Sequence, residues 1–176
     1  MKKAFDIKKR RGIMRIVQII SLFLFLFVLS SCVQQVDFDA EKEQVNAVLD
    51  ICNKGWESQD LTAISSVYAH DPDMIAFGTD LAERFVGWED LEKSLKEMFA
   101  SFNDVTYQIS NRTIKISKSG DVAWFTEIQD IKLIVNEEKI ELKNGRNTGV
   151  LEKRDGKWVI VQSHFSLPVE GQAAEY

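Results

Sequence analysis

The stretch from Gly145 to Pro168, GRNTGVLEKRDGKWVIVQSHFSLP, constrains the fold more than any other part of the chain. Two runs rich in strand-forming residues flank the Asp155-Gly156 dipeptide, a pair that is typical of β-hairpin turns. We therefore expect a hairpin here that closes a larger sheet. Arg146 and His164 also lie in this stretch, and they are the side chains in it best suited to chemistry.

The length of the turn decides which way the hairpin side chains point, because a shift of one residue reverses the two faces. A three-residue turn pairs Arg146 with His164 and sorts polar from apolar side chains more cleanly, so we favour it. A two-residue turn places them on opposite faces. In the favoured register one face holds Arg146, Thr148, Val150, Ile160, Gln162 and His164, and the other holds Leu151, Val159, Val161, Phe165 and Leu167. The apolar face should pack on helices, and the polar face is a candidate outer, dimer-forming face.

The rest of the chain after residue 38 supplies helices first and long strands afterwards. Apolar residues recur at helical spacing in 39–58, 61–68 and 87–102, and short strands are expected at 74–77 and 84–86. Alternation then predicts long strands at 104–118, 122–135, 140–153 and 158–167. This order indicates an α+β fold, in which a strongly curved antiparallel sheet packs on three N-terminal helices and encloses a cavity.

A break in the alternation predicts where the sheet bends. Apolar residues fall at odd positions up to Ile109 and at even positions from Ile114 onward. An extra residue must lie between them, so we expect a β-bulge near Asn111, and bulges bend sheets.

The N-terminal segment has the organisation of a secretory signal. Residues 1–15 are basic, residues 16–29 are apolar apart from two polar side chains, and Leu29-Ser30-Ser31-Cys32 follows. This ending resembles the lipobox of bacterial lipoproteins. The resemblance implies a signal peptide over 1–31, lipid on Cys32, and a tether over 32–40. The residue after the cysteine is Val33 and not Asp, which resembles the pattern of lipoproteins that are sent on to the outer membrane. The resemblance therefore implies a protein of the bacterial cell envelope, anchored in the outer membrane and facing the periplasm.

Removal of residues 1–31 would leave a strongly acidic chain. The sequence has 22 Lys and Arg against 27 Asp and Glu, and the leader carries seven of the basic residues but a single acid. The net charge would then be about −11, so no nucleic-acid partner is expected, since such binding depends on basic contacts to phosphate. Cys52 is the only other cysteine, so no internal disulfide is expected. Two histidines and no cysteine cluster argue against a metal site, and no cofactor is expected.

Three motifs in order resemble the SnoaL-like branch of the nuclear transport factor 2-like fold. They are Phe77-Gly78-Thr79-Asp80 with Gly87-Trp88, then Gly120-Asp121-Val122-Ala123-Trp124-Phe125, then the closing hairpin with Asp155-Gly156-Lys157-Trp158. The hairpin is also similar to that of the association domain of calcium/calmodulin-dependent kinase. The resemblance covers a domain at 41–168, followed by a tail at 169–176, and implies a cone-shaped fold. Members include isomerases, dehydratases, cyclases, epoxide hydrolases and binding modules.

Candidate site residues follow from the fold and the chemistry of the side chains. His164, Arg146 and Glu127 are the candidate catalytic residues, with His164 as a general base and Arg146 as an anchor for an anion. Structural or interface roles compete with each of these roles, and partial exposure is the simpler interpretation of Glu127. The expected ligand-lining residues are Trp56, Phe77, Phe99, Tyr107 and Phe165. Gly149 and Phe165 stand where the kinase association domain would have cavity arginines, so a more apolar cavity is expected.

We favour a lipid-anchored protein that binds a small apolar or amphipathic molecule, and we expect a homodimer. One alternative is a small cofactor-independent enzyme of the isomerase, dehydratase or cyclase type. Another is a structural or dimerising module that works through the outer face of the sheet.

Overall fold

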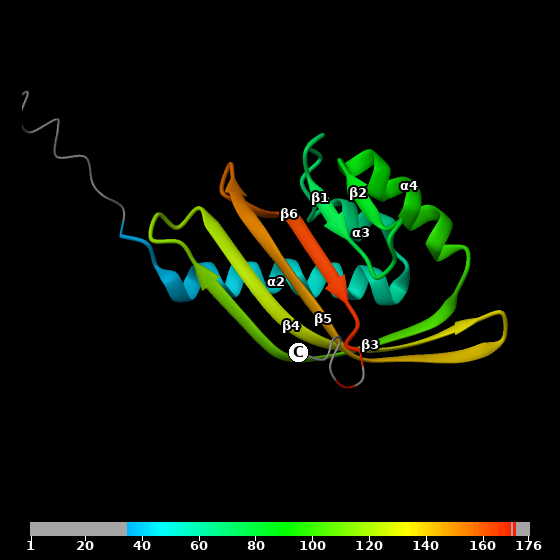
Figure 1. Ribbon diagram of the computed structural model, residues 1–176. Helices are drawn as coiled ribbons and strands as arrows, with labels where there is room; N and C mark the ends of the chain where they lie inside the picture. Colours follow the sequence, from blue (N-terminus) through cyan, green and yellow to red (C-terminus); the bar gives the residue numbers. More distant parts are fainter. Residues whose placement is uncertain (1–34, 170, 172–176) are drawn as a thin grey trace, which may run out of the picture. The chain divides into compact units, whose positions relative to one another are not determined.

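The computed structural model describes residues 35–169 and 171, and Figure 1 shows their arrangement. The predicted signal peptide, Cys32 and the start of the tether lie outside the described residues. The chain from Val36 onward forms a compact unit with its own hydrophobic core. Within the described residues, no helix is both long and apolar enough to cross a bilayer.

Three helices precede the long strands, as predicted. They are α2 (Phe38–Ser58), α3 (Leu61–Ser65) and α4 (Trp88–Phe99). The side chain of Asp37 caps α2, and that of Asp60 caps α3, each by accepting hydrogen bonds from two backbone N–H groups. The second helix ends at Ser65 rather than at the expected Tyr68, because residues 67–69 instead bond to Ile160 at the edge of the sheet.

The strands form one six-stranded sheet in the order β2-β1-β6-β5-β4-β3. Their bounds are β1 (Ile75–Phe77), β2 (Arg84–Val86), β3 (Asn103–Ile116), β4 (Val122–Val135), β5 (Glu138–Arg154) and β6 (Lys157–Ser166). The four long strands are antiparallel, but β1 pairs with β6 in parallel, so the sheet is mixed rather than wholly antiparallel. The α+β architecture is confirmed.

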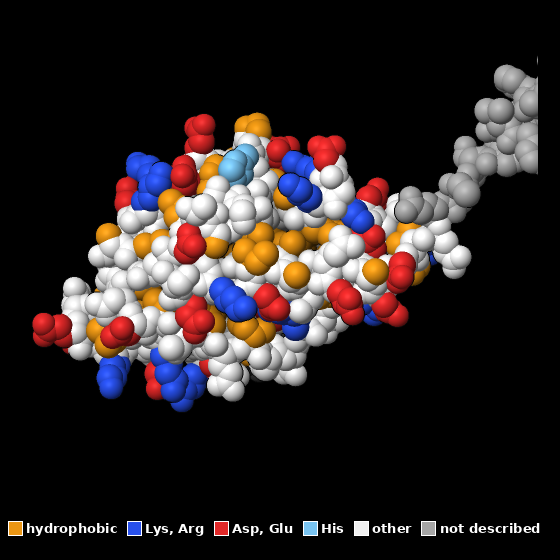
Figure 2. All heavy atoms as spheres, turned by 180° about the vertical axis from the view of Figure 1, so that it is seen from behind, with side chains coloured by type: hydrophobic (Ala, Val, Ile, Leu, Met, Phe, Trp, Pro, Cys, Tyr) orange, Lys and Arg blue, Asp and Glu red, His pale blue; other side chains and the backbone are white. Residues whose placement is uncertain are grey.

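Helix α2 crosses one face of the long strands, which we call the inner face (Figure 1). Val45 and Leu49 of α2 pack there against Phe125 and Leu151 in the main core. Figure 2 shows the molecule from behind, on the side where α2 lies. Acidic and basic side chains are interspersed on this side, and they do not form a broad basic patch.

The predicted bulge near Asn111 is confirmed. The pairing of β3 with β4 shifts between Ser110 and Thr113, and Asn111 has a φ of 52°, in the left-handed region. The extra residue reverses the parity of the strand. Arg112, which simple alternation from Ile109 would place outside, therefore lies on the inner face with Ile114.

The favoured register of the closing hairpin is wrong. Arg154 pairs with Lys157, so the turn is the two-residue one, Asp155-Gly156. Further along, the register shifts because β6 has an extra residue, Val161, and beyond it Thr148 pairs with His164 and Arg146 with Ser166. The bulge reverses the parity of β6, so Arg146 and His164 do share the outer face, although they are not directly paired.

The same correction applies to the apolar residues of β6. Ile160, which the favoured register placed beside Arg146, is 1% exposed and lies in the core, while Val159 is only half-buried. All four residues of the run Trp158-Val159-Ile160-Val161 are apolar. The run therefore shows no alternation of polar and apolar side chains that could tell which side faces inward.

Glu41 fastens the start of α2 to the closing hairpin. Lys153 Nζ lies 2.6 and 2.8 Å from the two carboxylate oxygens of Glu41, and Trp158 Nε1 donates to Oε2 at 2.9 Å. The hydrogen bond from Lys153 is the main reason why the pKa of Glu41 is lowered, and the bond from Trp158 adds to this effect. Both bonds favour the ionised carboxylate.

We expect Glu41→Gln to lower the melting temperature at neutral pH by on the order of 5 °C, because it removes a charged acceptor. A carboxyl whose pKa is lowered by folding stabilises the protein above its unfolded pKa, about 4.3 for Glu. That contribution is lost as the pH falls through the folded pKa, so the difference between the two proteins should shrink below pH 4. Glu138→Gln, at an exposed position in β5, is the control. A difference that is constant from pH 7 to pH 3 would contradict the assignment.

Candidate functional site

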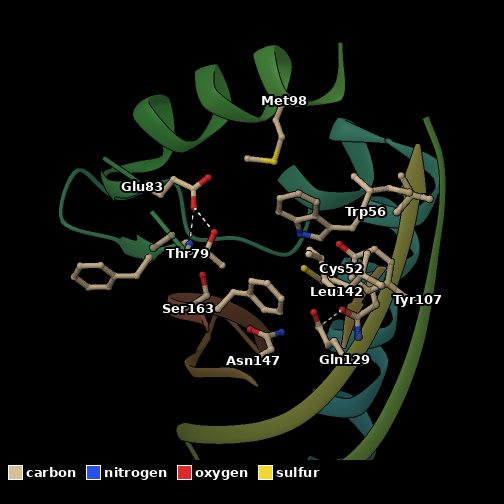
Figure 3. Close-up of a pocket in the computed structure, with 18 of the residues that line it drawn as sticks. Cys52, Trp56, Thr79, Glu83, Met98, Tyr107, Gln129, Leu142, Asn147 and Ser163 are labelled. Atoms are coloured by element: carbon tan, nitrogen blue, oxygen red, sulfur yellow. Dashed lines mark hydrogen bonds between the residues drawn. The ribbon is translucent and has the colours of Figure 1, made fainter. Parts of the chain in front are cut away.

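A cavity of about 530 Å³ lies between the helices and the inner face of the sheet. Its walls come from α2, α4, the β1–β2 region and strands β3 to β6, and Figure 3 shows its lining. Most of the surface is aromatic or aliphatic. The apolar lining residues include Trp56, Phe85, Leu91, Met98, Phe102, Val105, Ile131, Leu133 and Leu142. A pocket of this size and character is suited to a small molecule.

Four of the five expected ligand-lining residues meet at this cavity. Trp56, Phe77, Tyr107 and Phe165 all line it, although they come from α2, β1, β3 and β6. Phe99 does not line it. Its ring instead packs edge-on against Trp56, with 5.5 Å between the ring centroids, and so holds the indole in place from behind.

A buried carboxylate organises the polar end of the cavity. Glu127 is 2% exposed, so the interpretation of this residue as partly exposed is wrong. Its Oε2 accepts a hydrogen bond from Arg112 Nε at 2.7 Å. Its Oε1 accepts from the amide nitrogens of Gln129 at 2.7 Å, Asn147 at 3.1 Å and Asn53 at 3.2 Å.

Arg112 connects this carboxylate to the surface of α2. Its Nη1 donates to Asn46 Oδ1 at 2.7 Å and to Asp50 Oδ1 at 2.6 Å. Burial of the guanidinium works to lower its pKa, but the bonds and charges of Asp50 and Glu127 outweigh burial, and the net effect is a raised pKa. Arg112 therefore stays charged, and both of its acidic partners lie on the side away from the cavity lining.

The titratable side chains in the deep wall hold their protons. Burial raises the pKa of the Cys52 thiol to about 12, so it is not a nucleophile at neutral pH. Burial likewise raises the pKa of the Tyr68 and Tyr107 hydroxyls above the ordinary value. Tyr68 donates to Ser163 Oγ at 3.2 Å. These three groups are therefore neutral at neutral pH.

Arg146 and His164 lie elsewhere. Both are exposed and belong to the outer face of the sheet, and neither lines the cavity. His164 contacts the Phe77 ring edge-on, with 5.9 Å between centroids. The inner positions of the same two strands hold Asn147, Gly149, Ser163 and Phe165. Of the three candidate catalytic residues, only Glu127 is near the cavity, and the amides of Asn53, Gln129 and Asn147 stand between it and the open space.

Sequence reasoning missed the amides and Arg112. Asn53, Gln129 and Asn147 carry no charge and occur in no motif, so nothing in the local sequence singles them out. Arg112 could have been found, because the predicted bulge at Asn111 changes its face. Among residues 35–169 and 171, no group of three or more His, Cys, Asp or Glu side chains is placed to hold a metal ion.

Comparisons with known proteins agree with this fold. No curated protein matches the chain significantly. A nuclear transport factor 2-like superfamily protein from Salmonella enterica serovar Typhimurium has a TM-score of 0.69 and 17% identity, over 78% of this chain and 98% of that one. A proposed dehydratase of the same family from Streptomyces avermitilis has a TM-score of 0.65 and 15% identity, over 74% and 99%. At these identities the likeness concerns the fold alone.

A third solved structure comes from Xanthomonas campestris and is described as a candidate calcium/calmodulin-dependent protein kinase II association domain. It has a TM-score of 0.61 and 26% identity, over 72% of this chain and 87% of that one. The family model of the SnoaL-like domain matches residues 45–170. Because that match covers well over half of the sequence and includes every strand of the sheet, the chain belongs to the SnoaL-like domain family.

Proposed function

We propose that this protein binds a small apolar or amphipathic molecule in the cavity between α2, α4 and the inner face of the sheet. The cavity itself carries the proposal, because it has room for a small molecule and a mostly apolar wall, with the amides of Gln129 and Asn147 and the Ser163 hydroxyl at one end. The lipobox-like sequence at Leu29–Cys32 supports the further proposal that the domain is lipid-anchored in the bacterial cell envelope.

Acid–base catalysis is less well supported than binding. A general base must reach the ligand and must be unprotonated at the working pH. Cys52, Tyr68 and Tyr107 have raised pKa values, so they are protonated at neutral pH. Both carboxylate oxygens of Glu127 already accept hydrogen bonds, from four N–H donors in all. The arrangement favours holding a molecule over transferring its protons.

The binding proposal is tested with the chain from Val33 onward, which includes the whole compact unit. Native mass spectrometry should detect a co-purified molecule, and the uncharged apolar dye N-phenyl-1-naphthylamine should bind with increased fluorescence. Leu142→Trp fills the cavity wall and should abolish dye binding, whereas Lys143→Trp, at the next and exposed position of β5, should not. Absence of any bound molecule, with no dye binding and no change in melting temperature across a metabolite panel, would refute the proposal.

Glu127 has a structural role in this proposal, and its removal should cost stability. Loss of one member of a buried ion pair typically costs about 3–5 kcal/mol, because the groups that it bonded stay buried. Here these groups are Arg112, which keeps Asp50 as its other counter-charge, and three amides that lose their acceptor. We expect Glu127→Leu to lower the free energy of unfolding by about that amount in urea denaturation. The double variant Glu127→Leu, Arg112→Met should recover part of the loss. A single variant within about 1 kcal/mol of the wild type would show that the pair is not needed for folding.

The outer face of the sheet supports a second proposal, that two copies of the chain associate there. Trp124 is 47% exposed on this face and pairs directly with the half-buried Val150 of β5. An exposed tryptophan beside another apolar side chain is typical of a contact surface.

We expect a dimer by size-exclusion chromatography with light scattering, and a monomer after Trp124→Glu. Leu81→Glu is the control, because Leu81 is fully exposed but lies in the loop between β1 and β2. A wild-type protein that is monomeric at every concentration tested would refute this surface as a dimer contact.

A further inference from the structure

We call the polar end of the cavity, where Gln129, Asn147 and Ser163 lie, the cavity floor. The orientation of its hydrogen-bond donors and acceptors restricts the kind of ligand that fits. Glu127 receives hydrogen bonds only from N–H groups, so it serves purely as an acceptor. An amide side chain that turns its nitrogen toward Glu127 must turn its oxygen away. The carboxylate therefore fixes the orientation of Gln129, Asn147 and Asn53.

Two of the three amide oxygens are left for the cavity. Asn53 Oδ1 accepts from Gln129 Nε2 at 3.3 Å and is thereby used. Gln129 is 4% exposed and lines the cavity, yet within the described part of the chain no group donates to its Oε1. The same holds for Asn147 Oδ1. No fully buried polar side-chain atom among the described residues lacks a partner, so these two oxygens must border open space.

Figure 3 shows where this open space lies. Asn147, Gln129 and Ser163 lie at one end of the cavity, opposite Met98, and the oxygen of Asn147 points to the Ser163 side. The Ser163 hydroxyl already accepts from Tyr68, so its own proton is available to a ligand. The floor thus offers two acceptors and a neutral donor side by side.

The charges around the cavity disfavour an anion. The acidic residues Asp80 and Glu83 belong to its lining, and Glu127 stands directly behind the floor. None of the described residues that line it is Lys, Arg or His. Arg112, the cation nearest to the floor, is already bonded to Glu127 and Asp50. A carboxylate placed here would lose its hydration and meet two acceptors and nearby negative charge, with no cation in the described lining to compensate for it.

We propose that the ligand is an apolar molecule whose inner end carries a hydrogen-bond donor, a hydroxyl or an amine, and that anions are rejected. This inference rests on the proposed binding function and specifies its ligand class. Gln129 Oε1 and Asn147 Oδ1 accept from the donor, and the aromatic wall of Trp56, Tyr107 and Phe165 contacts the apolar body. A hydroxyl fits best, since it can also accept from Ser163.

The test compares three probes that share one ring system, as competitors of N-phenyl-1-naphthylamine. They are 1-naphthalenemethanol, 1-naphthalenemethylamine and 1-naphthoate. The alcohol or the amine should displace the dye at a concentration at least about tenfold lower than the carboxylate requires. If the dye binds and naphthoate competes as well as or better than both others, this inference fails while the binding function stands. If neither the dye nor any probe binds, the binding function fails, and the ligand class fails with it.

Near-isosteric variants locate the effect at the floor. Gln129→Met and Asn147→Leu remove the two acceptors and should weaken the alcohol about five- to tenfold relative to naphthoate. The dye should still bind to both variants, because most of its contacts are with the apolar wall. Dye binding also reports that each variant is folded. Thr79→Val is the matched control, because it removes a hydroxyl that lines the cavity from the loop between β1 and β2 rather than from the end where the amides lie. A loss in Thr79→Val as large as in both amide variants would overturn the assignment, and the comparison of probes on the wild type remains decisive if a variant does not fold.

Discussion

The buried pair of Arg112 and Glu127 is the interaction on which the interior of this molecule depends. Arg112 comes from β3 and Glu127 from β4, and the partners of the pair extend to Asn46, Asp50 and Asn53 of α2 and to Asn147 of β5. One charged pair therefore ties the first helix to three adjacent strands. Burial of two charges is costly unless every hydrogen-bonding position is used, and here four N–H donors saturate the carboxylate. The same saturation sets the direction of every amide at the cavity floor.

This pair exists only because the strands are irregular. A regular β3 would carry Arg112 to the outer face with Ser110, and the left-handed residue Asn111 turns it inward. Asn144, also left-handed, marks a second irregularity, between the pairing of Gly145 with Gln129 and that of Leu142 with Ile131. Each extra residue exchanges the faces of its strand and bends the sheet. The bends that make room for the cavity are therefore the ones that decide which side chains line it.

The sequence allows the irregularity at Asn111 to be predicted, but not those at Asn144 and Val161. Around Asn111 the flanking residues alternate strongly, so a change of parity is visible as Ile109 gives way to Ile114. Around Asn144 the run Lys143-Asn144-Gly145-Arg146-Asn147 is polar on both faces, and around Val161 the strand is apolar on both faces. Alternation carries no information where both faces are alike. The order of elements, the helix caps and the aromatic wall follow from local pattern, whereas the register of β5 and β6 depends on contacts made across the sheet.

Because the register of β5 and β6 cannot be read from the local sequence, the two reactive side chains of these strands did not identify the cavity. Arg146 and His164 lie on the outer face, and the inner positions between and beside them hold Asn147, Ser163 and Phe165. The buried charges of Arg112 and Glu127 form an ion pair with each other. Glu127 and Arg112 hold the neutral amides at the cavity in a fixed orientation. In the proposed function the pair would therefore affect a ligand through the amide dipoles rather than by contact. A cavity built in this way can select a molecule by the direction of its hydrogen bonds while most of its wall stays apolar.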